Sequence, residues 1–175
     1  RLVVTPDVET TPLFNPKSIL TTTRMKTFRR CPREHYNAYE LGYRPLVDNE
    51  NLRFGTLMHV ALEAWWKADD NRFEAASAAL NAQSPEVDPF DLWKARALMC
   101  GYHARWEADM EHYDVRAVEA TFIAPLRNPE SGRPSKTWKL GGKLDALVVD
   151  RRDGRVLIVD HKTSSEDVSP GSNYC

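Results

Sequence analysis

Residues 141–165, GGKLDALVVDRRDGRVLIVDHKTSS, combine two apolar runs with charged side chains that could do chemistry. Asp145 interrupts the first run, and Asp160 and Lys162 follow the second. The β-branched and aliphatic residues predict two strands, and the Asp-Gly pair in residues 151–154 predicts the turn between them. The sequence therefore predicts an antiparallel hairpin that carries two carboxylates and an ammonium group.

The turn sets which residues of this hairpin face each other. If residues 151–154 form the loop, Asp145 faces Asp160 and Lys143 faces Lys162, and the Cβ atoms of facing residues lie about 4.5–5.5 Å apart. Two opposed carboxylates destabilise a sheet and raise the pKa of one of them. A divalent cation would remove both costs, because Mg²⁺ commonly takes one or two protein carboxylates. The alternative is a hairpin whose acids sit at its open end in solvent.

Lys162 and His59 add to this pattern. Lys162 returns to the face of Asp160, where an ammonium group could hold or deprotonate water, or stabilise charge that develops on a phosphate. His59 lies in an apolar stretch that predicts a helix from just after Gly55 to about Lys67, and its neutral imidazole could bind a cation directly or through water. The alternative for His59 is a histidine that is hydrogen-bonded in the core.

Four segments occur in the order found in one known nuclease family: SILTTTRMKTFRRCPREHYNAYELGY (18–43), FGTLMHVALEAWW (54–66), LGGKLDALVV (140–149) and VDHKTSS (159–165). On these motifs the chain resembles the PD-(D/E)xK nuclease superfamily and, within it, the RecB-type nuclease domain. Leu144 stands where the family's name places a proline. Proteins of this type usually continue beyond the second hairpin strand, so the resemblance also implies that a C-terminal part is missing.

The resemblance implies a metal site and a catalytic set. The catalytic residues are Asp145, Asp160 and Lys162, and the metal ligands are His59, Asp145, Asp160 and the backbone carbonyl of His161, with Mg²⁺ or Mn²⁺ as the cofactor. Glu119, on an expected strand over residues 115–123, is a further candidate ligand, and its alternative is an outward-facing polar residue on an edge strand. Some RecB-type domains hold an iron–sulfur cluster, but only Cys31 matches its first ligand, and four thiolates are normally needed.

The implied function is a metal-dependent deoxyribonuclease, an exonuclease rather than an endonuclease, that acts in DNA recombination or repair. The expected partners are single- or double-stranded DNA, with its ends as the substrate, and a helicase or recombination protein. The expected location is the cytoplasm of a bacterial or phage-infected cell. Two alternatives remain: a catalytically inactive nuclease-like module that binds DNA or protein, and a metal-dependent hydrolase with non-nucleic substrates.

Composition sets the outer limits. The 175 residues fit one domain, the net charge is −1, and no run is apolar enough to cross a membrane. A chain close to neutral has no general attraction for DNA, so local patches would have to supply it. The region of Arg24, Lys26, Arg29, Arg30 and Arg33 is either such a patch or a solvated helix face. The three scattered cysteines indicate a reducing compartment, and we expect Cys31 to be a buried, small apolar residue.

The expected fold is α/β, with a restriction-endonuclease-like mixed central β-sheet flanked by helices and an N-terminal helical layer. Residues 1–17 are expected to be an extended arm, and residues 18–175 a single domain. Ser18 is expected to cap a helix over residues 19–30, and Pro32 to begin one that Gly42 stops. The remaining expectations are a loop over 43–53, helices over 71–82 and 89–112, with Trp93, Ala97, Cys100, Ala104 and Met110 inward on the second, and a loop over 128–134.

Overall fold

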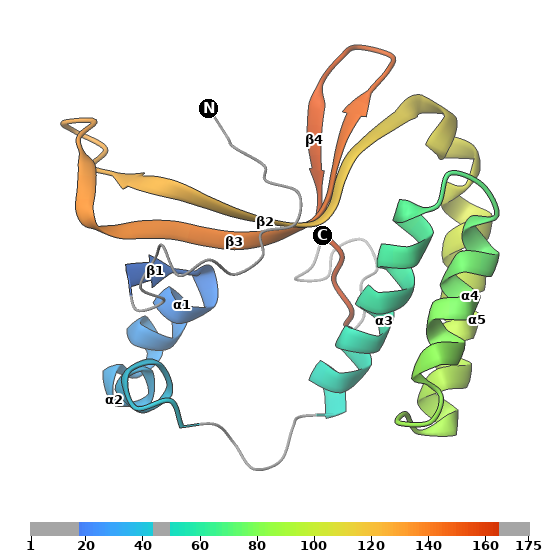
Figure 1. The fold of residues 1–175 in the computed structure, drawn as a ribbon, viewed down its shortest axis with the longest axis horizontal. Coiled ribbons are helices and arrows are strands. Elements are labelled where there is room, and N and C mark those ends of the chain that lie inside the picture. Colours follow the sequence, from blue (N-terminus) through green and yellow to red (C-terminus); the bar gives the residue numbers. More distant parts are fainter. Residues whose placement is uncertain (1–17, 44–49, 165–175) are drawn as a thin grey trace, which may run out of the picture. The chain divides into compact units, whose positions relative to one another are not determined.

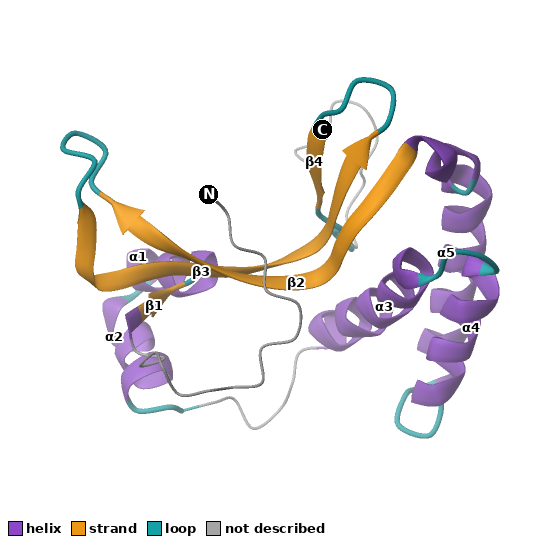
Figure 2. Cartoon of the chain, turned by 45° about the horizontal axis from the view of Figure 1, so that its top comes forward, coloured by secondary structure: helices purple, strands orange, loops and turns teal. Residues whose placement is uncertain are grey.

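The computed structural model describes residues 18–43 and 50–164, so the predicted arm over residues 1–17 and the end of the chain lie outside the described residues. Along the chain follow β1 (Ile19–Leu20), α1 (Thr22–Arg30), α2 (Pro32–His35), the π-helix η2 (Tyr36–Glu40), α3 (Glu50–Lys67), α4 (Arg72–Gln83), α5 (Pro89–Trp106), the 3-10 helix η3 (Ala108–His112), β2 (Tyr113–Arg127), β3 (Pro134–Asp150) and β4 (Val156–Val159), as Figures 1 and 2 show.

The strands form one mixed sheet. The order is β1-β3-β2, with β4 also paired to β3; β1 runs parallel to β3 and β4 runs antiparallel to it. This arrangement confirms the predicted α/β class with a mixed sheet. None of the helices that the structure describes has the length and apolar composition needed to cross a membrane.

The chain divides into two compact units. Unit 1 comprises residues 1–47 and 119–144, and unit 2 comprises residues 48–118 and 145–175. The single domain expected over residues 18–175 stays a prediction.

The described part of unit 1 has a short strand where the sequence predicted the start of a helix. Ile19 and Leu20 pair with Lys139 and Leu140, and the helix cap is Thr21, whose hydroxyl accepts a hydrogen bond from the Arg24 backbone N–H at 3.1 Å. The predicted cap at Ser18 is therefore wrong by three residues. The β-branched Ile19 finds a strand partner more than a hundred residues away, which local propensity cannot reveal.

The second helical segment of unit 1 follows the prediction. Pro32 begins α2, η2 continues to Glu40, and Gly42, with a φ of 77°, ends the segment. Cys31, between α1 and α2, is half-buried. The interpretation of the basic residues as a solvated face is wrong for Arg24, which is 4% exposed. The other four basic residues of this region are exposed: Lys26, Arg29, Arg30 and Arg33.

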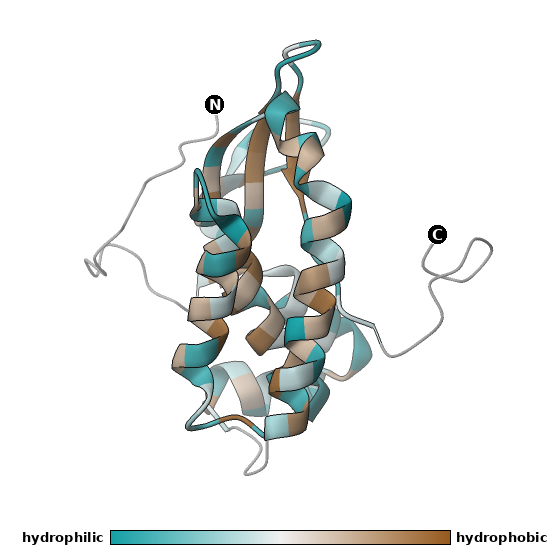
Figure 3. Cartoon of the chain, turned by 90° about the vertical axis from the view of Figure 1, so that its right-hand side faces the viewer, coloured by the Kyte–Doolittle hydropathy of each residue, from teal (hydrophilic) through white to brown (hydrophobic). Residues whose placement is uncertain are grey.

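Unit 2 contains a helical layer of α3, α4 and α5, which lie side by side in Figures 1 and 2. Hydrophobic and hydrophilic positions alternate along its helices in Figure 3, as expected for amphipathic helices with one buried face. The core of this unit consists of Leu57, Met58, Ala61, Leu62, Trp65, Trp66, Ala76, Leu80, Leu92, Ala95, Met99, Met110, Ala146 and Val148. It therefore joins the three helices to the β3–β4 hairpin.

Two helix predictions in unit 2 need correction. Helix α3 begins at Glu50, so Gly55 lies inside it and not before it. A side chain at Gly55 would place its Cβ 3.3 Å from Thr163 Oγ1, which gives a packing reason for a glycine inside a helix. In α5 the predicted inward stripe is also out of phase: Trp93 is 69% exposed, whereas its neighbour Leu92 is buried, and of the predicted inward residues Met110, in η3, is the one that is buried. Both stripes have helical spacing, so periodicity alone could not choose between them.

The hairpin has the register that the turn predicted. Ala146 pairs with Val159, Leu147 with Ile158, Val148 with Leu157 and Val149 with Val156. The loop is closed by a hydrogen bond of 2.8 Å from the Asp150 backbone N–H to the Arg155 carbonyl. The Asp-Gly turn thus fixes which residues of β3 and β4 meet.

Candidate metal and catalytic site

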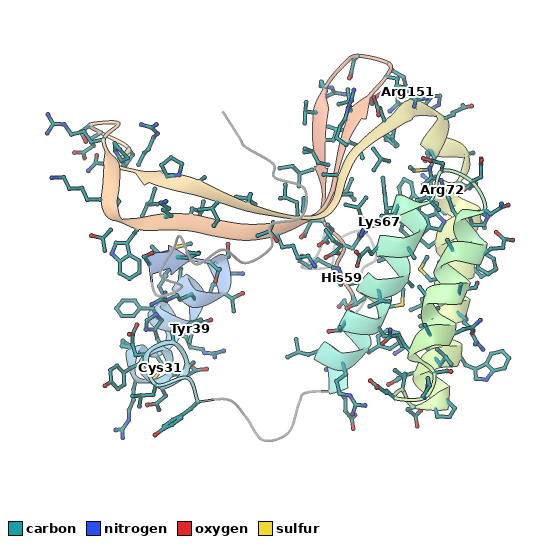
Figure 4. All side chains as sticks on the ribbon, in the orientation of Figure 1. Cys31, Tyr39, His59, Lys67, Arg72 and Arg151 are labelled. Atoms are coloured by element: carbon teal, nitrogen blue, oxygen red, sulfur yellow. The ribbon has the colours of Figure 1, made fainter. Side chains whose placement is uncertain are left out.

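His59 and Asp145 come together within unit 2. His59 lies on α3 (Figure 4), and its Nδ1 is 3.6 Å from Asp145 Oδ1. The His59 side chain is 34% exposed and that of Asp145 12%, so both are sheltered and still reachable from solvent. A helix and a strand anchored in the same core hold these side chains, which fixes a nitrogen and an oxygen donor close to each other.

The second oxygen of Asp145 is also held. The backbone N–H of His161 donates a hydrogen bond of 2.6 Å to Asp145 Oδ2. This N–H belongs to the segment just after β4, so the end of the hairpin orients the carboxylate of Asp145. Such a hydrogen bond restricts the rotamer of the carboxylate.

Asp160 does not face Asp145 in the described ladder, which ends at Ala146 and Val159. Its Oδ1 accepts a hydrogen bond of 2.6 Å from Lys162 Nζ, and the two side chains are 63% and 71% exposed. The predicted facing pair is therefore absent from this ladder. Opposed carboxylates repel each other, and here each has a different partner, a backbone N–H for Asp145 and an ammonium group for Asp160.

Three side-chain rings lie around the His161 ring. The ring centroids of Trp66, Tyr102 and His59 lie 5.9, 5.8 and 6.5 Å from that of His161. Trp66 Nε1 donates a hydrogen bond of 3.0 Å to the Tyr102 hydroxyl, and burial raises the pKa of Tyr102 to about 12. The sequence interpretation overlooked Trp66 and Tyr102. One available signal was the spacing of seven residues between His59 and Trp66, which puts both on one face of α3.

Glu119 is described within unit 1. It lies in β2, where the predicted strand over residues 115–123 is confirmed, and its φ of 54° is unusual for a residue other than glycine. Its carboxylate is 11% exposed and forms an ion pair with Lys143. The Glu119 carboxylate is therefore mostly covered, and its role as a ligand stays a prediction. Lys143 stands two positions before Asp145 in β3, and side chains two apart in a strand share a face.

The side-chain types at these positions fit a divalent ion. Within unit 2, His59 and Asp145 offer an imidazole nitrogen and carboxylate oxygens that could hold a metal ion. Carboxylate oxygens are the ligands that Mg²⁺ and Mn²⁺ prefer, and imidazole suits transition metals. The sheltered Asp145 carboxylate next to His59 therefore fits the cofactor that the sequence predicted.

A family model described as the PD-(D/E)XK nuclease superfamily matches residues 19–173. The chain belongs to the PD-(D/E)XK nuclease superfamily. Comparisons with curated proteins and with solved structures find no match. The mixed sheet flanked by helices is consistent with a restriction-endonuclease-like fold. Membership in this superfamily indicates a nuclease with a nucleic acid substrate and a divalent metal ion.

Proposed function

We propose that this member of the PD-(D/E)XK superfamily is a metal-dependent deoxyribonuclease that hydrolyses phosphodiester bonds. The observation that carries the proposal is the sheltered pair of His59 Nδ1 and Asp145 Oδ1, 3.6 Å apart, with the second Asp145 oxygen fixed by the His161 N–H. The resemblance to RecB-type domains supports the finer part of the proposal. In this finer proposal, the protein is an exonuclease of DNA recombination or repair that acts on DNA ends in the cytoplasm. Its partner is a helicase or recombination protein.

His59 and Asp145 would hold Mg²⁺ or Mn²⁺, with Glu119, Asp160 and the backbone carbonyl of His161 as further ligands. When bound, the ion would polarise the phosphate and stabilise the leaving oxygen. The His161 N–H keeps Asp145 in one orientation, because it occupies the oxygen that does not face His59. Such hydrogen bonds to ligating carboxylates commonly tune metal affinity.

Lys162 would act on water and on the phosphate. The reaction forms a bond from the oxygen of water to phosphorus and breaks one ester P–O bond, so that the products are a phosphate monoester and an alcohol. Lys162 Nζ, now paired with Asp160 Oδ1, can orient the water and neutralise charge on the phosphate oxygens. Lys162 thus has a role separate from metal binding.

The test is digestion of end-labelled single- and double-stranded DNA with Mg²⁺, with Mn²⁺ and with EDTA, alongside titration calorimetry of Mn²⁺. We expect Asp145→Asn to weaken metal binding by about 10–100-fold, and Asp153→Asn, a change in the exposed hairpin turn, to leave it unaltered. Lys162→Arg should retain metal and DNA binding and lose most cleavage, because the planar guanidinium differs in shape and does not titrate. Lys67→Arg, in another exposed Lys–carboxylate pair, is its matched control.

The results separate this function from its alternatives. DNA binding without metal-dependent cleavage would identify a catalytically inactive module, which the solvent-exposed pairing of Asp160 with Lys162 favours. Cleavage of simple phosphodiesters or phosphomonoesters without cleavage of DNA would identify a hydrolase with other substrates. Equal loss of metal affinity in Lys162→Ala and Asp145→Asn would refute the division of roles.

A further inference from the structure

Charge is divided unequally between the two units. Unit 1 contains 13 lysines and arginines and 6 acidic residues, whereas unit 2 contains 11 and 19. The chain as a whole has a net charge of −1, so the near-neutral total conceals a basic unit and an acidic one. A polyanion is attracted to the first and repelled by the second, because a surface potential reflects the local charge. Unit 1 is therefore the part of the chain that suits a nucleic acid.

Unit 1 also contains a continuous stack of rings and one guanidinium, which we call the aromatic stack. It consists of Phe28, His35, Tyr39, Arg24 and Trp138 in that order of contact. The Phe28 ring meets the His35 ring edge-on with centroids 5.3 Å apart, and the His35 ring stacks on Tyr39 with centroids 5.0 Å apart and an interplanar angle of 30°. The Arg24 guanidinium lies 5.3 Å from the Tyr39 ring centroid and 5.4 Å from that of Trp138. Figure 4 labels Tyr39 of this stack.

The two ends of the aromatic stack reach solvent. Phe28 is 55% exposed and Trp138 is 36% exposed, while Arg24 between them is buried. Hydrogen bonds of Arg24 fix the interior of the aromatic stack, and its outer rings present open faces or edges to solvent. A flat apolar group can stack on such rigid rings at low entropic cost. Nucleic acid bases are such groups, and every base has a π-face.

Basic side chains accompany these rings. Arg29 follows Phe28 directly and is exposed. Arg33 lies three residues before Tyr36 in the same helical segment, and Tyr36 is 54% exposed, so the two are neighbours on its surface. An exposed ring beside an exposed guanidinium group, as at Tyr36 and Arg33, can bind a base and a phosphate of one strand together, and Phe28 and Arg29 add an exposed ring and an exposed charge on α1.

We propose that unit 1 binds a single strand of DNA, with bases on Phe28 and Tyr36 and phosphates on Arg29 and Arg33. This inference rests on the proposed function in taking DNA as the ligand. A single strand is favoured over a duplex because the base faces of a duplex are covered by their neighbours, whereas unstacked bases can lie on protein rings. Duplex DNA would gain from the basic side chains alone.

The experiment measures binding by fluorescence anisotropy in EDTA, with a labelled 20-nucleotide oligothymidylate or a labelled 20-base-pair duplex and the full chain. We expect Phe28→Leu to weaken oligothymidylate binding about tenfold and duplex binding less than twofold, since stacking contributes about 1–3 kcal/mol per base. Phe28→Tyr should bind like the unchanged chain, because it keeps the ring. The matched control is Phe90→Leu in unit 2, where a phenylalanine that is 75% exposed is lost from the acidic unit.

A second arm tests the phosphate contacts. Arg33→Gln should weaken both ligands and reduce the slope of log affinity against log salt by about one, and Arg105→Gln in unit 2 should change neither. The proposal is overturned if Phe28→Leu leaves oligothymidylate binding unchanged, if it weakens both ligands equally, if Phe90→Leu has the same effect, or if the unchanged chain binds no oligonucleotide.

The outcomes also separate this inference from the proposed function. Strand binding that depends on Phe28, together with no metal-dependent cleavage, would overturn the nuclease and keep the binding surface. Metal-dependent cleavage with a Phe28→Leu variant that binds normally would keep the nuclease and overturn the surface.

Discussion

Replacing Arg24 by methionine tests how unit 1 is held together. The side chain is 4% exposed, and its hydrogen bonds to described residues run from Nε to His35 Nε2 at 3.1 Å, from Nη1 to the Ile19 carbonyl at 3.1 Å, and from Nη2 to Glu40 Oε1 at 3.0 Å. These bonds join α1 to β1, to α2 and to η2. Methionine keeps much of the apolar stem of arginine and loses all three donors, so the variant isolates the polar contribution.

The magnitude follows from the number and surroundings of these bonds. Hydrogen bonds that involve a charged group contribute about 1.5–3 kcal/mol each, and loss of one partner of a buried ion pair costs about 3–5 kcal/mol. Because Glu40 is 33% exposed, water can replace part of what it loses, which puts the expected cost at the lower end. We therefore expect about 3 kcal/mol, and 1.36 kcal/mol corresponds to a factor of ten in an equilibrium constant.

Hydrogen–deuterium exchange can locate this loss, because amide protection reports local opening free energy. Peptides that cover β1 and α1 should exchange roughly 100-fold faster in Arg24→Met, and peptides from α3 should exchange at their original rate. Arg29→Met, an exposed arginine on the same helix, should leave both rates within threefold. Unchanged amide protection in α1, or an equal change of the exchange rate in both units, would refute the assignment. Arg24 would then not be the residue that holds the elements of unit 1 together.

Three further outcomes test other contacts. Asp150→Asn should lower the melting temperature at pH 7, and this difference should vanish as pH falls from about 4 to about 2, because a neighbouring arginine lowers the pKa of Asp150 from 3.8 to about 2. Tyr102→Phe should cost about 1–3 kcal/mol in urea unfolding, since it leaves Trp66 Nε1–H without its acceptor. Gly141→Ala should cost about 1–3 kcal/mol, because its Cβ would lie 2.5 Å from a side-chain carbon of β1, whereas Gly101→Ala in α5 meets no atom within 4 Å and should stabilise by up to about 1 kcal/mol.

The hairpin was predictable because its information is local. The Asp-Gly turn and the β-branched runs fix the pairing from Val149–Val156 to Ala146–Val159, and only the turn has to be identified correctly. Where the ladder ends was not predictable. It ends before Asp160, because the carboxylate of Asp145 takes the His161 N–H and Asp160 takes Lys162, and local propensity does not rank such competing partners.

The burial of Arg24, by contrast, could not be predicted from the local sequence. In the sequence it is one of five basic residues within ten positions, and its helical neighbours Lys26 and Arg29 are exposed. Its burial depends on Trp138, which contacts it from more than a hundred residues away. A guanidinium is also weakly hydrated and planar, so arginine is more easily buried against rings than lysine is. No periodicity distinguishes such an arginine from a solvated one.

The two aspartates of the hairpin differ in how far the fold prepares them for a metal ion. Asp145 has one oxygen on the His161 N–H and the other directed at His59, so an ion that binds there orders little that is not already ordered. Asp160 lies outside the ladder, and its Oδ1 accepts a hydrogen bond from Lys162 in an exposed pair. As a metal ligand it would therefore have to be ordered by the ion itself, whereas Asp145 would not.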